Sequence, residues 1–206
     1  METEKLIWKE QQRQTVFSCP IFSVQNIESS SPDGTVGNFK VLQSAHWSLV
    51  IPLFDAQHFV MVRQWRHGMQ ALSLEFPGGV CNKGEDPLCA GLRELHEETG
   101  YYPHRMIRLG SFNPNPALMT NQVHIFLAED LHADRQNLDT DEYLAVELVP
   151  IEEVRAGMGK TPYVHALMAS ALLLFLNTRN YTPPNPVSVC AQTEQSFLQR
   201  SAEKAP

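Results

Sequence analysis

The most informative stretch of the chain is residues 79–101, which read GVCNKGEDPLCAGLRELHEETGY. A helix should begin at Pro87, because proline is preformed for the first helical position and Asp86 can accept an otherwise unpaired backbone N–H. The helix should end at Gly100, since glycine readily adopts the left-handed conformation that closes helices. The local sequence therefore predicts one helix with both of its ends marked.

Three acidic residues crowd one face of this predicted helix. Glu94, Glu97 and Glu98 have i, i+3 and i+4 spacing, so their carboxylates repel each other by a few tenths of a kcal/mol per pair. Arg93, at i−4 from Glu97, is the basic residue placed to steady them. Crowded carboxylates are typical ligands of a hard divalent cation. Taken alone, an acidic face exposed to solvent is the more common explanation.

The residues before the helix favour the metal-site interpretation. Gly78 and Gly79 end a predicted strand, so the backbone there can pass close to a metal ion or a phosphate. Glu85 lies where the loop becomes the helix, and a helix N-terminus favours anionic groups.

The spacing of these residues resembles the complete Nudix motif. Eight specified positions match, and a chance match is on the order of 10⁻⁹ per window. The matching positions are Gly79, Glu85, Arg93, Glu94, Leu95, Glu97, Glu98 and Gly100. One departure is Tyr101, where the family usually has an aliphatic residue.

Further segments resemble the ADP-ribose and nucleoside-diphosphate-sugar pyrophosphatase branch of that family. They are residues 39–42 with Trp47, 62–68, 74–79, 115–121 and 142–147, within a similarity that covers roughly residues 15–176. This resemblance implies metal-dependent hydrolysis of the pyrophosphate bond of ADP-ribose or a related nucleoside diphosphate sugar. The products would be a nucleoside monophosphate and a sugar phosphate, and the cofactor Mg²⁺ or Mn²⁺. His46 and Ala145 replace acids that are common in the branch.

The resemblance also implies roles for individual residues. Glu94 and Glu98 would be metal ligands and Glu97 a ligand or an acceptor of metal-bound water, with further contributions from the Gly78 carbonyl and Glu85. Arg93 would hold the glutamates in place. The expected general base is Glu142 on a loop before a late strand, with Asp139, Asp141 and a glutamate of the motif as alternatives.

Candidate substrate-binding residues lie outside the motif. Arg66 would bind diphosphate oxygens, with Arg63 as second candidate and Glu75 as an ion-pair partner of one of them. Trp47 could stack on a base, although an ordinary core or interface tryptophan is at least as common a reading. Met119 is a candidate for the ribose or base pocket, as are Phe112 and Tyr163.

The order of expected strands and helices predicts an α/β fold, of the α+β kind, with a mixed sheet between helices. The resemblance implies that these layers form the Nudix-type α/β/α sandwich. We expect an N-terminal β lobe over residues 1–45, a Nudix domain over 46–178 and a loosely packed tail over 179–206. Expected strands cover residues 17–24, 38–44, 48–54, 58–66, 72–76, 105–112, 122–128 and 143–149, with helices at 151–156 and 162–176. The resemblance further implies a homodimer formed through the N-terminal lobe.

Composition excludes several other classes of protein. With 16 basic and 23 acidic residues, the net charge of −7 argues against nucleic-acid binding and RNA decapping. The apolar run at residues 164–176 is too short to span a membrane, and residues 1–5 contain no signal-peptide pattern. Four scattered cysteines are typical of a reducing, cytoplasmic setting.

Alternative functions stay open from the sequence. Within the enzyme class, the substrate could instead be GDP-mannose, a nucleoside triphosphate or a dinucleoside polyphosphate. A non-catalytic module that binds nucleotide sugars is the alternative of a different class.

Overall fold

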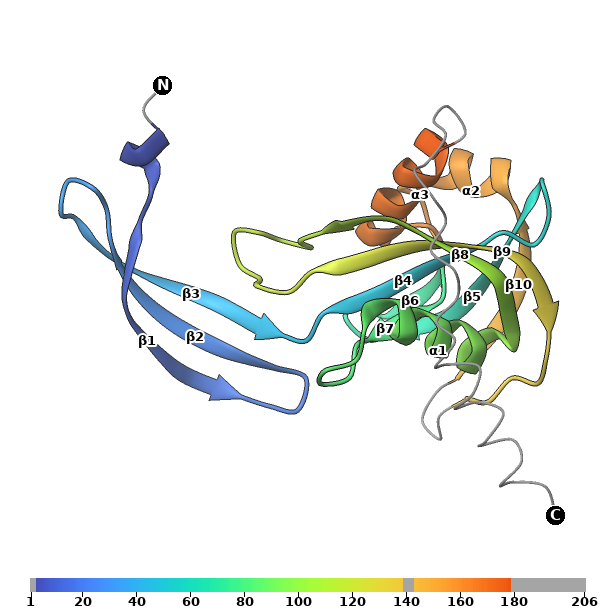
Figure 1. Ribbon diagram of the computed structural model, residues 1–206, viewed down its shortest axis with the longest axis horizontal. Coiled ribbons are helices and arrows are strands. Elements are labelled where there is room, and N and C mark those ends of the chain that lie inside the picture. The colour runs from blue at the N-terminus through green and yellow to red at the C-terminus, as the bar shows by residue number, and fades with distance from the viewer. Residues whose placement is uncertain (1–2, 139–142, 179–206) are drawn as a thin grey trace, which may run out of the picture. The chain divides into compact units, whose positions relative to one another are not determined.

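The computed structural model describes residues 3–138 and 143–178 (Figure 1). The described residues form two compact units, one of those up to His46 with Asn113–Gln122, the other of Trp47–Phe112 with those described from Val123 onward. The elements are η1 (Thr3–Leu6), β1 (Lys9–Ser18), β2 (Phe22–Ser30), β3 (Val36–Ser44), β4 (Trp47–Pro52), β5 (His58–Arg66), β6 (Ala71–Glu75), β7 (Gly78–Val80), α1 (Pro87–Thr99), β8 (Tyr101–Phe112), β9 (Val123–Ala133), β10 (Leu144–Pro150), α2 (Ile151–Gly157) and α3 (Ala166–Thr178).

The N-terminal unit is built on a three-stranded antiparallel sheet in the order β1-β2-β3. The expected strand over residues 17–24 is wrong, because the chain reverses between Ser18 and Phe22. Pro20 lies in this turn and has no N–H to donate to a neighbouring strand, so the strand pairing is interrupted there. The alternation of apolar residues continues across the turn and therefore does not reveal it. A bridge between Leu42 and Met119 joins residues 113–122 to the sheet.

The second unit contains two sheets. One has the order β7-β4-β9-β8, and its β4–β9 pair is parallel whereas its other pairs are antiparallel. The other is antiparallel with the order β10-β5-β6. The mixed sheet expected from the sequence is therefore present, with the remaining strands forming a separate sheet.

Helices cover both faces of the mixed sheet, as Figure 1 shows for α1 and α3. Side chains alternate between the two faces along each strand. Val50 and Phe126 face Leu92 and Leu95 of α1. Their neighbours in sequence belong to a larger core, which also contains residues of the second sheet and of α2 and α3: Ile51, Phe59, Met61, Leu74, Phe76, Ile125, Leu127, Val154, Met168, Leu172 and Phe175. The α/β/α layering predicted from the sequence is confirmed.

The first helix forms as its sequence predicts. Asp86 accepts a hydrogen bond from the N–H of Leu88 at 2.8 Å through Oδ1. Gly100 closes the helix with φ of 72° and donates its N–H to the carbonyl of His96 at 2.8 Å. These caps satisfy backbone groups that a helix end otherwise leaves unpaired, so the register of the glutamates on α1 is fixed.

The last helix begins later than expected. Residues 162–165 precede α3, and the Pro162 carbonyl accepts a hydrogen bond from the N–H of Leu74 at 3.1 Å. The chain therefore covers the open edge of β6 before it turns into the helix. Among the described helices, none is long and apolar enough to cross a membrane.

Candidate active site

The segment of residues 78–86, which is β7 with the loop that follows it and is called the glycine loop below, brings two glycines against two glutamates of α1. Gly78 donates its N–H to Oε2 of Glu98 at 2.9 Å. A Cβ at Gly78 would lie 2.3 Å from the carbonyl oxygen of Ser48, and a Cβ at Gly79 would lie 2.5 Å from Oε1 of Glu94. The absence of a side chain at Gly79 therefore leaves the space that the Glu94 carboxylate occupies, and its absence at Gly78 lets the backbone pass close to β4.

Arg93 gathers the acidic residues around its guanidinium. Its Nε donates to Oε1 of Glu85 at 3.0 Å, and its Nη1 donates to Glu94 at 2.8 Å and to Glu97 at 2.9 Å. Its Nη2 reaches the carbonyl of Val80 at 3.1 Å. One planar cation thus ties the helix to both ends of the preceding loop.

The charge of this cluster is reflected in shifted pKa values. Burial alone would lower the pKa of Arg93, but its hydrogen bond to Glu85 and the charge of Glu94 outweigh burial and raise it. Burial alone would likewise raise the pKa of Glu85, and the hydrogen bond from Arg93 reverses the direction and lowers it. Both groups are therefore stabilised in their charged forms at neutral pH.

The donor atoms beside the glycine loop have the chemistry that a hard divalent cation requires, whereas three of the glutamates are directed at Arg93. Glu94 and Glu98 are 9% and 4% exposed, and both lie against the glycine loop, where an added Cβ would occupy the space beside Glu94. Carboxylate and carbonyl oxygens are the ligands that Mg²⁺ and Mn²⁺ prefer. Within residues 3–138 and 143–178, no three acidic, histidine or cysteine side chains converge on a common point as metal ligands would. Glu85, Glu94 and Glu97 point instead to Arg93.

Replacing Arg93 tests its hold on the acidic residues. Arg93→Met should lower the free energy of unfolding by about 1–3 kcal/mol, because partly buried carboxylates lose their partner. The lowered pKa of Glu85 gives stability that is present above its unfolded value of about 4.3 and is lost as pH falls through the folded value. The difference in the free energy of unfolding between Arg93→Met and wild type should therefore be largest at neutral pH and shrink below about pH 4.

Urea unfolding between pH 3 and 8 measures this effect. The matched control is Arg105→Met, which removes an ion pair to Glu129 from an arginine that is 48% exposed and should cost about 0–1 kcal/mol. Equal losses in the two variants, or a difference that does not depend on pH, would contradict the structural role of Arg93.

The two candidate arginines of β5 have different partners. Arg66 forms a two-pronged ion pair with Glu75, Nε to Oε1 at 2.9 Å and Nη2 to Oε2 at 2.6 Å. The hydrogen bond with Glu75 raises the pKa of Arg66, and the charge of Glu98 contributes to the same direction. Arg63 pairs with Glu147 of β10, Nη2 to Oε2 at 2.9 Å. The structure therefore brings Arg66 near the glycine loop and gives Arg63 a partner on another strand.

The remaining candidates are more scattered. Trp47 begins β4 and packs against the larger core. Met119 lies in the other unit, where its carbonyl accepts a hydrogen bond from the side chain of Asn113 at 2.7 Å. Glu142, Asp139 and Asp141 lie outside the described residues, so the general base stays a prediction.

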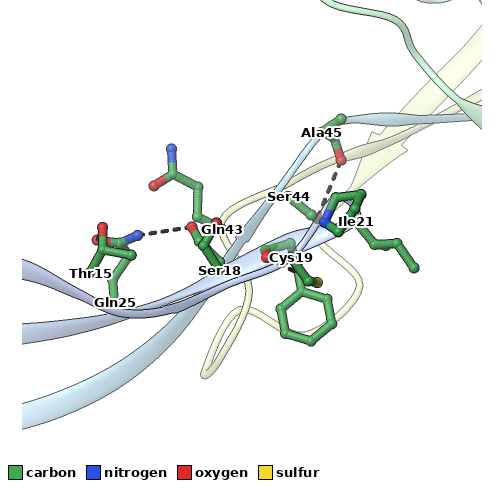
Figure 2. Close-up of a pocket in the computed structure, with 11 residues that line it drawn as sticks. Thr15, Ser18, Cys19, Ile21, Gln25, Gln43, Ser44 and Ala45 are labelled. Atoms are coloured by element: carbon green, nitrogen blue, oxygen red, sulfur yellow. Dashed lines mark hydrogen bonds between the residues drawn. The ribbon is translucent and has the colours of Figure 1, made fainter.

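A pocket in the N-terminal unit contains none of these residues. Its volume is about 530 Å³, and it lies at the turn between β1 and β2, beside the end of β3 (Figure 2). Most of its lining is polar, as in Thr15, Ser18, Gln25 and Gln43. The candidate site is instead an open arrangement around α1 and the glycine loop.

A family model of the NUDIX domain matches residues 45–168. The chain belongs to the Nudix family of hydrolases. The matched span contains α1, the glycine loop, Arg66 and Glu75, so the cluster described above is the Nudix motif in its structural setting.

Individual relatives support this assignment. The ADP-ribose pyrophosphatase of Bacillus subtilis is 32% identical over 73% of this chain and 80% of its own length. The methanol dehydrogenase activator of Bacillus methanolicus is 31% identical with the same coverage. A crystal structure of an ADP compounds hydrolase, 21% identical, superposes with a TM-score of 0.74 over 84% of this chain and 96% of the other, which shows the shared Nudix fold.

Sequence reasoning missed one residue near this Nudix site. His165 lies with Nε2 4.0 Å from Oε2 of Glu75, which is far away in the sequence. No spacing rule links the two positions. The one sequence signal for a role of His165 is its position directly before an apolar helix. The same position is equally compatible with His165 being an ordinary residue of that helix.

Proposed function

We propose that the protein hydrolyses the pyrophosphate bond of ADP-ribose or a related nucleoside diphosphate sugar in a divalent-metal-dependent reaction. The observation that carries this proposal is the acidic cluster beside the glycine loop, in which Glu98 accepts the N–H of Gly78 and Arg93 gathers Glu85, Glu94 and Glu97. The charge of Glu98 also acts on Arg66. The identity to the Bacillus subtilis ADP-ribose pyrophosphatase supports the choice of substrate.

The residues of the cluster suit this chemistry. When bound by Glu94, Glu98, the Gly78 carbonyl and Glu97 or Glu85, Mg²⁺ or Mn²⁺ would supply charge neutralisation for the pyrophosphate oxygens. Arg66 uses Nε and Nη2 for Glu75, so its Nη1 edge can bind a phosphate oxygen. Arg93 holds Glu94 and Glu97 at the loop. Glu142 takes the proton of the attacking water.

The decisive experiment is a substrate panel in heavy-oxygen water with Mg²⁺ or Mn²⁺. We expect ADP-ribose to give AMP and ribose 5-phosphate, with ¹⁸O in one product and no turnover in EDTA. Mass spectrometry identifies the products and the attacked phosphorus together. Faster turnover of GDP-mannose, a nucleoside triphosphate or a dinucleoside polyphosphate would replace the substrate assignment. Tight ADP-ribose binding without turnover under any metal would favour the non-catalytic module.

The same proposal includes a homodimer in the cytoplasm. Every residue of β1 is exposed, and the N-terminal sheet exposes large apolar side chains, among them Val16, Phe17, Ile21 and Phe39. A second copy of the lobe formed by residues 1–45 could cover them. Cys19 and Cys81 are free thiols, which suits a reducing compartment. Sedimentation equilibrium distinguishes the dimer from a 23.3 kDa monomer.

A further inference from the structure

His165 has a defined proton position because it caps the N-terminus of α3. Its Nδ1 accepts a hydrogen bond from the N–H of Leu167 at 3.1 Å, and its carbonyl accepts one from Met168 at 3.0 Å. A backbone N–H can only donate, so Nδ1 must be unprotonated. The neutral ring therefore carries its proton on Nε2, the nitrogen that faces Glu75.

The segment around His165 is fastened to both sides of Glu75. The N–H of Leu74 donates to the Pro162 carbonyl at 3.1 Å. The N–H of Phe76 donates to the sulfur of Met168 at 2.8 Å. Because the residues before and after Glu75 are bonded to residues before and after His165, the imidazole is held opposite the carboxylate.

The surroundings favour the neutral ring. Desolvation lowers the pKa of His165, and the charge of Arg66 adds to that direction against the opposing effect of Glu75. Protonation would also put a second N–H on Nδ1, which would face the N–H of Leu167 and break the cap. His165 is thus a hydrogen-bond donor without a charge at this position.

Glu75 is the group that this donor can influence. Its side chain is 4% exposed, and its two oxygens receive Nε and Nη2 of Arg66. The distance of 4.0 Å between Nε2 of His165 and Oε2 of Glu75 is too long for a direct hydrogen bond. A small movement of the two side chains toward each other, or one bridging water, would complete the contact. A further donor, beside Arg66 and the hydroxyl of Ser73, would fix the rotamer of Glu75 and with it the plane of the guanidinium.

We propose that His165 is a positioning residue, whose Nε2–H holds Glu75 so that the free Nη1 edge of Arg66 is directed at a diphosphate. The inference rests on the proposed function, since it concerns binding of the same substrate group. His165 acts through Glu75 and Arg66 and does not need to touch the reacting atoms.

Two substitutions distinguish the positioning of Glu75 by His165 from the capping of α3 by the same residue. Asparagine is a good N-cap but is too short to reach Glu75, so His165→Asn should keep the thermal midpoint of wild type. We expect it to raise KM for ADP-ribose about 10-fold, in line with the loss of a group that orients a binding residue, and to change kcat less. His165→Gln provides a longer amide donor and should recover part of the KM loss. Wild-type KM in His165→Asn, at an unchanged midpoint, would overturn the proposal.

A double-mutant cycle tests whether the effect passes through Glu75. In a Glu75→Gln background, His165→Asn should cause little additional loss, because the residue that it positions is already altered. An undiminished 10-fold effect in that background would overturn the route through Glu75.

Two measurements require no turnover and so keep this proposal separate from the choice of substrate. Imidazole ¹⁵N shifts of the full chain should show the proton of His165 on Nε2, and a proton on Nδ1 would overturn the assignment. Calorimetry with magnesium pyrophosphate should show weaker binding by His165→Asn than by wild type, and equal affinities would overturn it. If both results hold while ADP-ribose is not hydrolysed, only the proposed function fails.

Discussion

Glu98→Gln is expected to lower kcat for ADP-ribose by about 10²–10³-fold, which corresponds to about 3–4 kcal/mol of transition-state stabilisation. The uncharged amide is a weaker ligand for Mg²⁺ than the carboxylate. The amide oxygen can still accept the N–H of Gly78, which the carboxylate accepts at 2.9 Å, so the fold should be retained. Product formation followed by chromatography over a range of Mg²⁺ concentrations measures both the rate and the metal requirement.

Glu152→Gln is the matched control for this substitution. Glu152 lies on α2 and pairs with Arg155, and its side chain is 73% exposed, so removal of its charge should leave the rate unchanged. A wild-type rate in Glu98→Gln, with Glu152→Gln also normal, would remove Glu98 from the metal site.

Glu142→Gln should reduce kcat by about 10²–10⁴-fold, the range typical of losing a general base. The glutamine side chain has nearly the same shape and cannot take a proton from water. The loss should be larger at neutral than at high pH, where hydroxide supplies the nucleophile without a base. Initial rates between pH 6 and 10 measure both effects.

The neighbouring acids in the sequence provide controls for this substitution. Asp139→Asn and Asp141→Asn change the local charge by the same amount as Glu142→Gln and should reduce the rate little. If one of them instead shows the large loss and Glu142→Gln does not, the base belongs to that aspartate.

Elements with local signals were predictable from the sequence. The bounds of α1 follow from Asp86, Pro87 and Gly100, which act through hydrogen bonds within a few residues. The shared face of the α1 carboxylates and the contact between Arg93 and Glu97 follow from the helical repeat for the same reason. The contact between Arg93 and its sequence neighbour Glu94 does not follow from that repeat. In contrast, β7 has only three residues and exists because it pairs with β4, which the local sequence does not encode.

Other features depend on contacts that are distant in the sequence. The start of α3 was placed too early because the carbonyl of Pro162 is used by Leu74 and not by a helix. The different partners of Arg63 and Arg66, in contrast, follow from a local rule. Side chains alternate between the two faces of a strand, so residues three apart lie on opposite faces. From the sequence, Arg66 comes before Arg63 as the diphosphate-binding residue, but which of them pairs with Glu75 is left open, and the alternation favours Arg66.

The extent of α3 matters for anyone who wishes to trim the protein. The family match ends at residue 168, yet Ala171, Leu172 and Phe175 are each at most 4% exposed and complete the larger core. A chain shortened to the matched span would uncover Phe59, whose ring meets that of Phe175 edge-to-face with centroids 5.0 Å apart. Removal of a buried phenylalanine side chain such as that of Phe175 alone costs about 3–5 kcal/mol. A minimal catalytic fragment must therefore retain the helix to Thr178.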